Sequence, residues 1–243
     1  MNQIFLLNEL LAVSPEIKPK SSTNSESGMK LVVIDDVLKD YQKAYNTISN
    51  TPVADWKNGD GGKNFIDYKE GRLQYPVRNR NVLLEVAYHA IKHYYNVETD
   101  FQFGSIDVNV WKQITPRTND FNIVHTDQSC NSKQSYSCLF FMNQPEECSG
   151  GTAFFQHLPS KRYAGNVEEL GNLLKDNREL WHNGINYWNQ DTDGKVWRMT
   201  EHAEMVSNRL IIFPSDYFHT AYHPKDSFHD FSRLTLVFWM AEV

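Results

Sequence analysis

Short apolar runs separated by turn residues dominate the chain from residue 101 onward. Six or more such runs are typical of a double-sheet jelly roll or a barrel. The pattern therefore predicts a mainly β protein of one of these two architectures. The runs span residues 101–114, 122–127, 135–143, 150–156, 208–214 and 232–240.

The residues before this region show a different pattern of apolar and polar positions. Residues 30–35 (KLVVID) are typical of a buried strand, and an amphipathic segment follows to about residue 49. Apolar residues recur at helical spacing over 80–95, which predicts a helix with one apolar face. Residues 51–76 combine four glycines with several aromatics and indicate a long surface loop. Helices should therefore flank the β core.

Composition divides the chain into an N-terminal arm with a linker and one folded domain. Residues 14–28 are rich in Ser, Pro and Lys, so we expect an arm and linker over 1–28 and a domain over 29–243. Polar residues and one helical stretch over about 160–200 predict an insertion between two strands. The apolar stretch at the start is too short to span a membrane, so we expect a docking helix or mobile arm and no membrane partner.

Charge and cysteine content narrow the function classes. A formal net charge of −6 lacks the basic excess of a phosphate-binding surface, which makes nucleic acid an improbable partner. Three cysteines without a CxxC pair indicate neither a disulfide framework nor a zinc knuckle. A reducing compartment fits this usage, and we expect a cytoplasmic protein.

A candidate metal site lies in the sequence HTD. His125 and Asp127 are two residues apart at the end of an expected strand, so both side chains should point to one face. His219 follows a second buried strand and is the leading candidate for a third ligand. Two imidazoles and one carboxylate form the facial triad of non-haem Fe(II) oxygenases, which leaves three metal positions for other ligands.

Other histidines offer alternatives to this set. His223 lies four residues after His219 and could replace it as the distal ligand, but it precedes Pro224 in an expected turn. His89 and His93 have the i, i+4 spacing of a helical metal clamp. No third ligand accompanies that pair, so a border of the apolar helix face is the favoured interpretation.

The last apolar run contains a cation. Leu234, Leu236 and Phe238 alternate with Arg233, Thr235 and Val237, so Arg233 and Thr235 share a face of one strand. If that face is interior, the guanidinium needs an anion. A carboxylate such as the distal one of 2-oxoglutarate matches a planar guanidinium beside a hydroxyl. A salt bridge at the strand end is the structural alternative.

Four segments in this order resemble the core of the Fe(II)/2-oxoglutarate-dependent oxygenases, in their prolyl-4-hydroxylase-like branch. The resemblance implies a double-stranded β-helix with flanking helices, of the jelly-roll or cupin-like type. It also implies coupling of 2-oxoglutarate decarboxylation to hydroxylation of a substrate. The segments are HTD (125–127), SYSCLFFMNQPEECSGGTAFF (135–155), NRLIIFPSDYFHTAYHP (208–224) and SRLTLVFWM (232–240).

The same resemblance assigns roles to individual residues. It implies that His125, Asp127 and His219 bind Fe(II), and that Arg233 and Thr235 bind 2-oxoglutarate. The implied cofactors are Fe(II), 2-oxoglutarate and O₂, with ascorbate as a candidate reductant. The chain departs from the family where its strand before HTD reads VNVWKQI, because the family often has a tyrosine there for 2-oxoglutarate.

Two rival functions remain at this point. One is a cupin-like metal enzyme that does not use 2-oxoglutarate, and the other is a non-catalytic barrel that binds a ligand. The substrate could be an amino acid, a peptide or protein, or a small molecule. The sequence selects neither the substrate nor the oligomeric state. The loop at residues 56–75 is our candidate lid over the site, with a plain surface excursion as its alternative.

Overall fold

A computed structural model describes residues 12–50, 57–58, 70–76, 82–101, 107–113, 124–128, 133–175, 196–222, 224, 231 and 233–242. Its helices are α2 (Tyr41–Ser49), α3 (Val82–Tyr95), α4 (Val167–Lys175) and the short 3-10 helix η3 (Pro145–Glu147). Its strands are β1 (Lys20–Thr23), β2 (Lys30–Ile34), β3 (Lys57–Asn58), β4 (Glu70–Pro76), β5 (Asp107–Gln113), β6 (Ser135–Phe141), β7 (Gly151–His157), β8 (Trp197–Glu204), β9 (Arg209–Pro214), β10 (His219–Tyr222) and β11 (Arg233–Ala241).

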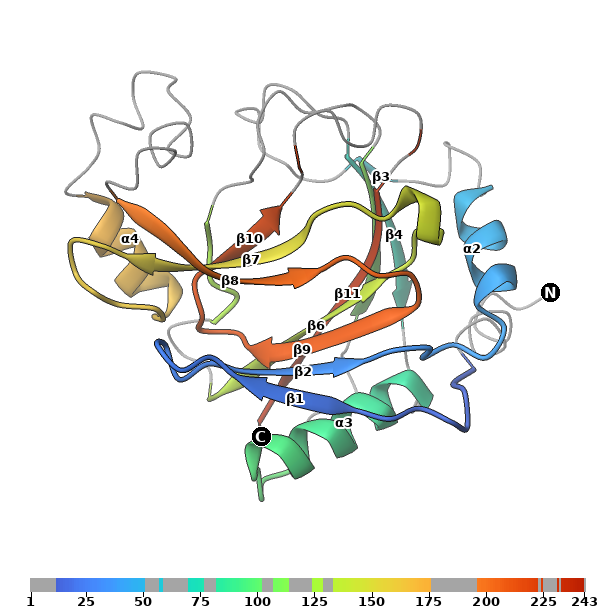
Figure 1. The fold of residues 1–243 in the computed structure, drawn as a ribbon, viewed down its shortest axis with the longest axis horizontal. Coiled ribbons are helices and arrows are strands. Elements are labelled where there is room, and N and C mark those ends of the chain that lie inside the picture. Colours follow the sequence, from blue (N-terminus) through green and yellow to red (C-terminus); the bar gives the residue numbers. More distant parts are fainter. Residues whose placement is uncertain are drawn as a thin grey trace.

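The described strands form two antiparallel sheets, which Figure 1 shows one above the other. The large sheet has eight strands in the order β1-β2-β9-β6-β11-β5-β4-β3, and the small sheet has the order β10-β7-β8. Several neighbours, such as β2 and β9, β6 and β11, and β10 and β7, come from distant parts of the chain, as in a jelly roll. The predicted fold class, a mainly β double-stranded β-helix with flanking helices, is confirmed.

An apolar core fills the space between the two sheets. Ile211, Phe213 and Phe141 contribute to it from the large sheet, and Phe154 and Ala203 contribute from the small one. The rings of Phe154 and Phe213 meet edge to face at 4.9 Å between centroids. We call the sheet surfaces that face this core the inward faces.

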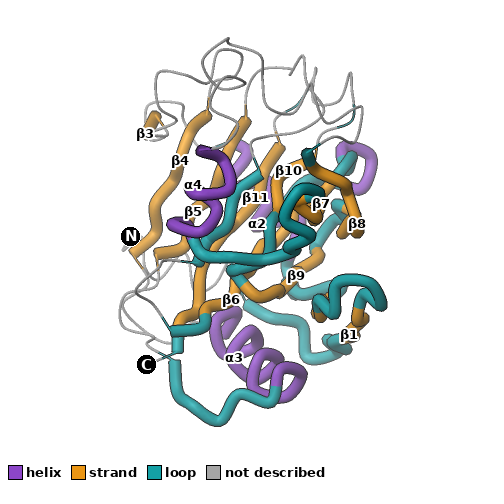
Figure 2. Tube along the Cα trace, turned by 90° about the vertical axis from the view of Figure 1, so that its left-hand side faces the viewer, coloured by secondary structure: helices purple, strands orange, loops and turns teal. Residues whose placement is uncertain are grey.

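A second core lies on the opposite face of the large sheet, where residues of α2 and α3 pack against it. Figure 2 shows α3 below β6. Strand β11 serves both cores because its two faces are buried: Leu234, Leu236 and Phe238 point toward the helices. Leu83, Ala87 and Ile91 of α3 belong to the same core. The helical spacing of residues 80–95 thus marks the packed face, and burial of each large side chain contributes roughly 1.5–3 kcal/mol.

Several predicted loops and strands need correction. The stretch read as linker contains β1, and the loop expected at 51–76 contributes β3 and β4. Strand β1 pairs with β2 through its backbone while all four side chains are exposed, so no apolar pattern marks it. The strand expected at 122–127 reduces, among its described residues, to a single bridge at His125. The division into an arm, a domain and an insertion stays a prediction.

Two segments of interest fall largely or wholly outside the described residues. The candidate lid at 56–75 is described only at β3 and at the start of β4, and residues 176–195 of the expected insertion are not described. The insertion's predicted helix is present as α4. Within the described part of the chain, no helix is long and apolar enough to cross a membrane.

The turn into β7 depends on a glycine. Gly151 has φ +146°, and a Cβ there would overlap the carbonyl oxygen of Ala203 on the neighbouring strand β8. We expect Gly151→Ala to lower the free energy of unfolding by about 2 kcal/mol or more, because both strain and overlap must be relieved. Chemical denaturation measures this loss.

A glycine in α4 is the matched control. A Cβ at Gly171 meets no atom within 4 Å, so Gly171→Ala should raise the free energy of unfolding by about 0.5–1 kcal/mol through helix propensity. Equal effects of the two substitutions would contradict the role assigned to Gly151.

Candidate metal centre

Two backbone hydrogen bonds bring the candidate histidines together. The His125 N–H donates to the His219 carbonyl at 2.9 Å, and the His219 N–H donates to the His125 carbonyl at 3.0 Å. Residues that exchange both bonds across an antiparallel pair carry their side chains on the same side. The two imidazole centroids therefore lie 4.4 Å apart, although the residues are distant in the sequence.

The carbonyl of Ser215 holds Asp127 in place. It accepts hydrogen bonds from the backbone N–H groups of Asp127 (2.9 Å) and Gln128 (3.1 Å) and from the hydroxyl of Thr126 (2.8 Å). Ser215 follows β9 directly, so these bonds attach the HTD segment to the end of a core strand. Asp127 is thereby placed beside the histidine pair.

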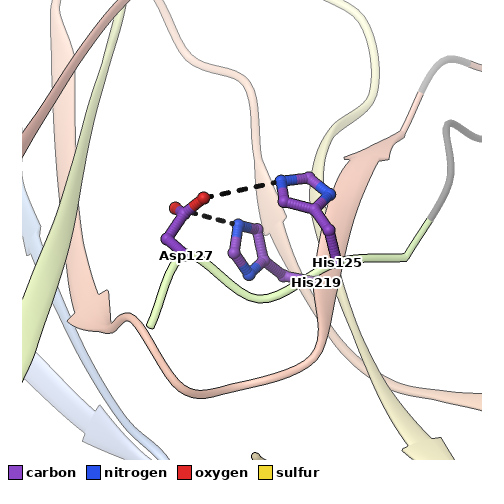
Figure 3. Close-up of side chains that lie close together, drawn as sticks. All are labelled: His125, Asp127 and His219. Atoms are coloured by element: carbon purple, nitrogen blue, oxygen red, sulfur yellow. Dashed lines mark ion pairs between the residues drawn. The ribbon is translucent and has the colours of Figure 1, made fainter. Parts of the chain in front are cut away.

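The three side chains converge, as Figure 3 shows. Asp127 Oδ1 lies 3.8 Å from His125 Nε2, and Asp127 Oδ2 lies 3.4 Å from His219 Nε2. All three ligand atoms fall within 4.8 Å of one another. Adjacent ligands on one metal ion, at bond lengths of about 2.1 Å, lie roughly 3 Å apart. Side-chain rotations of modest size therefore let this donor set fit a metal ion.

A backbone carbonyl and an aromatic ring orient the imidazole of His219. Its Nδ1 lies 2.8 Å from the carbonyl oxygen of Tyr217, which can only accept, so Nδ1 carries the proton. The other ring nitrogen, Nε2, faces Asp127, where it can donate to the carboxylate when protonated and bind a metal ion when deprotonated. Phe213 packs edge-on against the ring at 4.8 Å between centroids, and the His219 side chain is only 4% exposed.

Asp127 is ionised in this setting. Burial alone would raise its pKa, but the charge of His219 and its hydrogen bond, together with His125 and the hydroxyl of Ser137, outweigh burial and hold the Asp127 pKa well below its usual range. Ser137 Oγ donates to Asp127 Oδ2 at 2.6 Å. The Ser137 hydroxyl also lies 2.9 Å from that of Ser215. A carboxylate held this way offers a charged oxygen to a cation.

The group is open on one side. The side chain of His125 is 48% exposed, against 17% for Asp127 and 4% for His219. A ligand approaching from solvent would therefore reach the group beside His125, while the other two side chains form its buried wall.

Arg233 and Thr235 lie on the inward face of the large sheet. Thr235 pairs with Phe141, a residue of the core between the sheets, and Arg233 is two residues earlier on the same face. Both are buried, at 5% and 2% exposed. The guanidinium donates from Nη2 to the carbonyl of Gly151 at 3.3 Å and lies 5.9 Å from the centroid of the Phe141 ring. The shared interior face expected for the two residues is confirmed.

The histidines considered as alternative metal ligands do not join this group among the described residues. His89 and His93 lie on α3 in ring contact with Tyr88 and Tyr94, and they belong to no potential metal group among the described residues. His223 lies outside the described residues. The side chains of β5, the strand in which the family often has a tyrosine, lie outside the described part of the structure.

Sequence reasoning missed the residues that support the ligands. Ser137 orients Asp127, Ser215 bonds Ser137, and the carbonyl of Tyr217 orients His219. One signal was present: Ser135 and Ser137 alternate with Tyr136 and Cys138 in a strand that is otherwise apolar. A small polar residue repeated on one face of a core strand indicates a polar partner across that face.

Fold and site together define a double-stranded β-helix with two imidazoles and one carboxylate gathered between its sheets. The chain belongs to the family described as "Family of unknown function (DUF6445)", whose pattern matches residues 15–235. No curated protein matches the sequence.

Solved structures with a similar trace include 2-oxoglutarate-dependent enzymes. A prolyl-4-hydroxylase from Pseudomonas putida has a TM-score of 0.46 and 9% identity, over 94% of both chains. A Trichoplax adhaerens prolyl hydroxylase, solved with a peptide of hypoxia inducible factor, has a TM-score of 0.47 and 10% identity over 90% of this chain and 85% of its own. The carbocyclase SnoK of nogalamycin biosynthesis has a TM-score of 0.48 and 12% identity, over 89% of this chain and 80% of its own. At such identities these likenesses assign no role to any residue here.

Removing the Ser137 hydroxyl should weaken metal binding. Ser137→Ala takes away the hydrogen bond that orients Asp127, and loss of such a supporting bond typically lowers metal affinity 10- to 100-fold. Calorimetric titration with Mn(II), which avoids oxidation, measures the affinity. Ser215→Ala is the comparison, because its hydroxyl contacts Ser137, and we expect a smaller loss. Wild-type affinity in Ser137→Ala would refute this positioning role.

Proposed function

We propose that this protein is a non-haem iron oxygenase that couples oxidative decarboxylation of 2-oxoglutarate to hydroxylation of a substrate. The convergence of His125, Asp127 and His219 within 4.8 Å is the observation that carries the proposal. Two imidazoles and one carboxylate are the donor set of Fe(II) oxygenases, and they leave one face of the metal for other ligands.

The residues of this chain divide the work between binding metal and binding cosubstrate. His125, Asp127 and His219 hold the metal through one atom each. Arg233 and Thr235 hold the distal carboxylate of 2-oxoglutarate, because a buried guanidinium favours an anion and its planar N–H groups match a carboxylate. The keto acid end then extends along the inward faces toward the metal group.

Bound Fe(II) supplies the activation of O₂, so that one oxygen atom enters succinate as CO₂ leaves and the other enters a C–H bond of the substrate. The exposed side at His125 is the side from which substrate arrives. His219, enclosed by Phe213 and Phe154, keeps water from the opposite side. These residues thus orient the reactants and exclude solvent.

For the branch of the oxygenase superfamily and for the substrate, we propose classes and no single compound. The order of the four segments in the sequence supports the prolyl-4-hydroxylase-like branch, with an amino acid, a peptide or protein, or a small molecule as substrate. Ascorbate is the proposed reductant that restores Fe(II) after unproductive turnover.

Replacing any one ligand should abolish metal binding. We expect His125→Ala, Asp127→Ala and His219→Ala each to lose bound Fe(II), measured by metal analysis after anaerobic loading, while circular dichroism shows an intact fold. His157→Ala is the matched control, since His157 is equally buried but belongs to no metal group in the described structure. Full iron in His219→Ala and none in His223→Ala would move the distal ligand to His223.

Arg233→Lys should raise the apparent KM for 2-oxoglutarate about tenfold or more. An ammonium cannot reproduce the paired bonds of a guanidinium to a carboxylate, and each hydrogen bond to a charged group contributes roughly 1.5–3 kcal/mol. Arg209→Lys is the control, because the Arg209 guanidinium is already paired with the carboxylate of Asp35. An unchanged KM in Arg233→Lys would reduce Arg233 to a structural residue.

Succinate formation tests the proposal as a whole. Fe(II), 2-oxoglutarate and O₂ should give succinate even without substrate, at a slow rate that ascorbate sustains. Metal binding without succinate would favour an enzyme that does not use 2-oxoglutarate. Absence of metal binding would favour a non-catalytic barrel.

A further inference from the structure

A small side chain with a hydroxyl lies beside the histidine on the inward face of the small sheet. Strands β7 and β10 pair His219 with Phe154 and, two residues along, Ala221 with Thr152. Paired residues and every second residue share a side of the sheet, so Thr152 faces inward with His219 and Phe154. On its other neighbour, β8, Thr152 pairs with Ala203, a residue of the core between the sheets.

This hydroxyl is buried without a partner in the described structure. Thr152 is 1% exposed, and its Oγ1 has no hydrogen-bond partner among the described residues. The same holds for Oγ1 of Thr235, which is 2% exposed and lies on the opposing inward face of the large sheet. Buried hydroxyls are nearly always hydrogen-bonded, so two that lack partners on facing sheets beside a buried guanidinium leave donors available to an anionic ligand.

Both hydroxyls belong to the surroundings of Arg233. The guanidinium bonds the carbonyl of Gly151, the residue before Thr152, and Thr235 lies two residues after Arg233 on the same face. Along β7, Thr152 is two residues from the partner of His219, which is roughly 7 Å at 3.3 Å per residue. The span between the metal group and this cluster suits a short dicarboxylate.

We propose that Thr152 is a binding residue for the carboxylate held at Arg233, with its hydroxyl donating across the two sheets from the side opposite Thr235. The proposal rests on the proposed function, because it assigns the far end of the cosubstrate. In this arrangement the guanidinium supplies charge and the two hydroxyls supply donors on either side. The small sheet then contributes both a metal ligand, His219, and a cosubstrate ligand.

Binding of 2-oxoglutarate to Mn(II)-loaded protein without oxygen tests this role apart from activity. Thr152→Val keeps the shape but removes the hydroxyl, and we expect its dissociation constant for 2-oxoglutarate to rise about tenfold or more. Thr152→Ser should restore binding to within about threefold of wild type. Pyruvate, a keto acid without the distal carboxylate, should bind Thr152→Val and wild type equally.

Thr220→Val is the matched control on the same strand pair. Thr220 is also fully buried with an unpartnered hydroxyl among the described residues, but it pairs with Ala153 and so faces the outer side, away from Arg233. We expect its affinity for 2-oxoglutarate to equal that of wild type. A loss as large as that of Thr152→Val would overturn the assignment, because any buried hydroxyl would then produce the effect.

The remaining outcomes separate this assignment from the proposed function. Wild-type affinity in Thr152→Val overturns the role of Thr152 while leaving 2-oxoglutarate as the cosubstrate. An equal loss for pyruvate and 2-oxoglutarate also overturns it, since the hydroxyl would then act at the metal end. If wild-type protein binds Mn(II) but not 2-oxoglutarate, the proposed function fails together with this assignment.

Discussion

The exchange of two backbone hydrogen bonds between His125 and His219 is the constraint on which the site depends. It joins the HTD segment to the first residue of β10 in the small sheet, so that two side chains from distant parts of the sequence face the same point. The carbonyl of Ser215 adds Asp127 to the pair from the end of β9. Because backbone atoms make these bonds, the three ligand residues are held close together before any metal binds.

The inward faces carry polar groups at two places, with aromatic residues between them. At one end Ser137 and Ser215 support Asp127, and there the hydroxyls satisfy each other and the carboxylate. At the other end Arg233 is buried with the hydroxyls of Thr152 and Thr235. Polar groups inside a protein are stable when they are bonded. The first set is complete within the chain, whereas the second is completed by a ligand in our proposal.

Whether a helix or strand can be predicted from the sequence depends on the physical interaction that stabilises it. Core strands such as β9 and β11 are predicted because burial imposes an apolar pattern. Strand β1 is missed because its exposed side chains carry no such pattern and only its backbone pairs. Ser137 is missed for a related reason, since its role exists only once tertiary pairing brings Asp127 to it.

The candidate ligands were easier to identify because their chemistry is rare in a β core. A guanidinium in an apolar strand and an imidazole after a buried strand each need a partner, which makes Arg233 and His219 visible in the sequence. A threonine in a strand raises no such question, because it is a common strand residue. Thr152 therefore emerges only from the register that places it inward and from the absence of a partner for it among the described residues.

Strand register, and not loop conformation, sets the distance between the metal group and Arg233. Gly151 is central to that register because its backbone approaches Ala203 too closely for a Cβ, and its carbonyl also accepts the bond from Arg233. A shift of β7 by one residue would turn Thr152 and Phe154 outward and move the Gly151 carbonyl away from the guanidinium. The apolar pattern of the core resists such a shift, since Phe154 would leave its contact with Phe213. In our proposal, the packing that stabilises the sandwich thereby also fixes the length of ligand that can reach from Arg233 to the metal group.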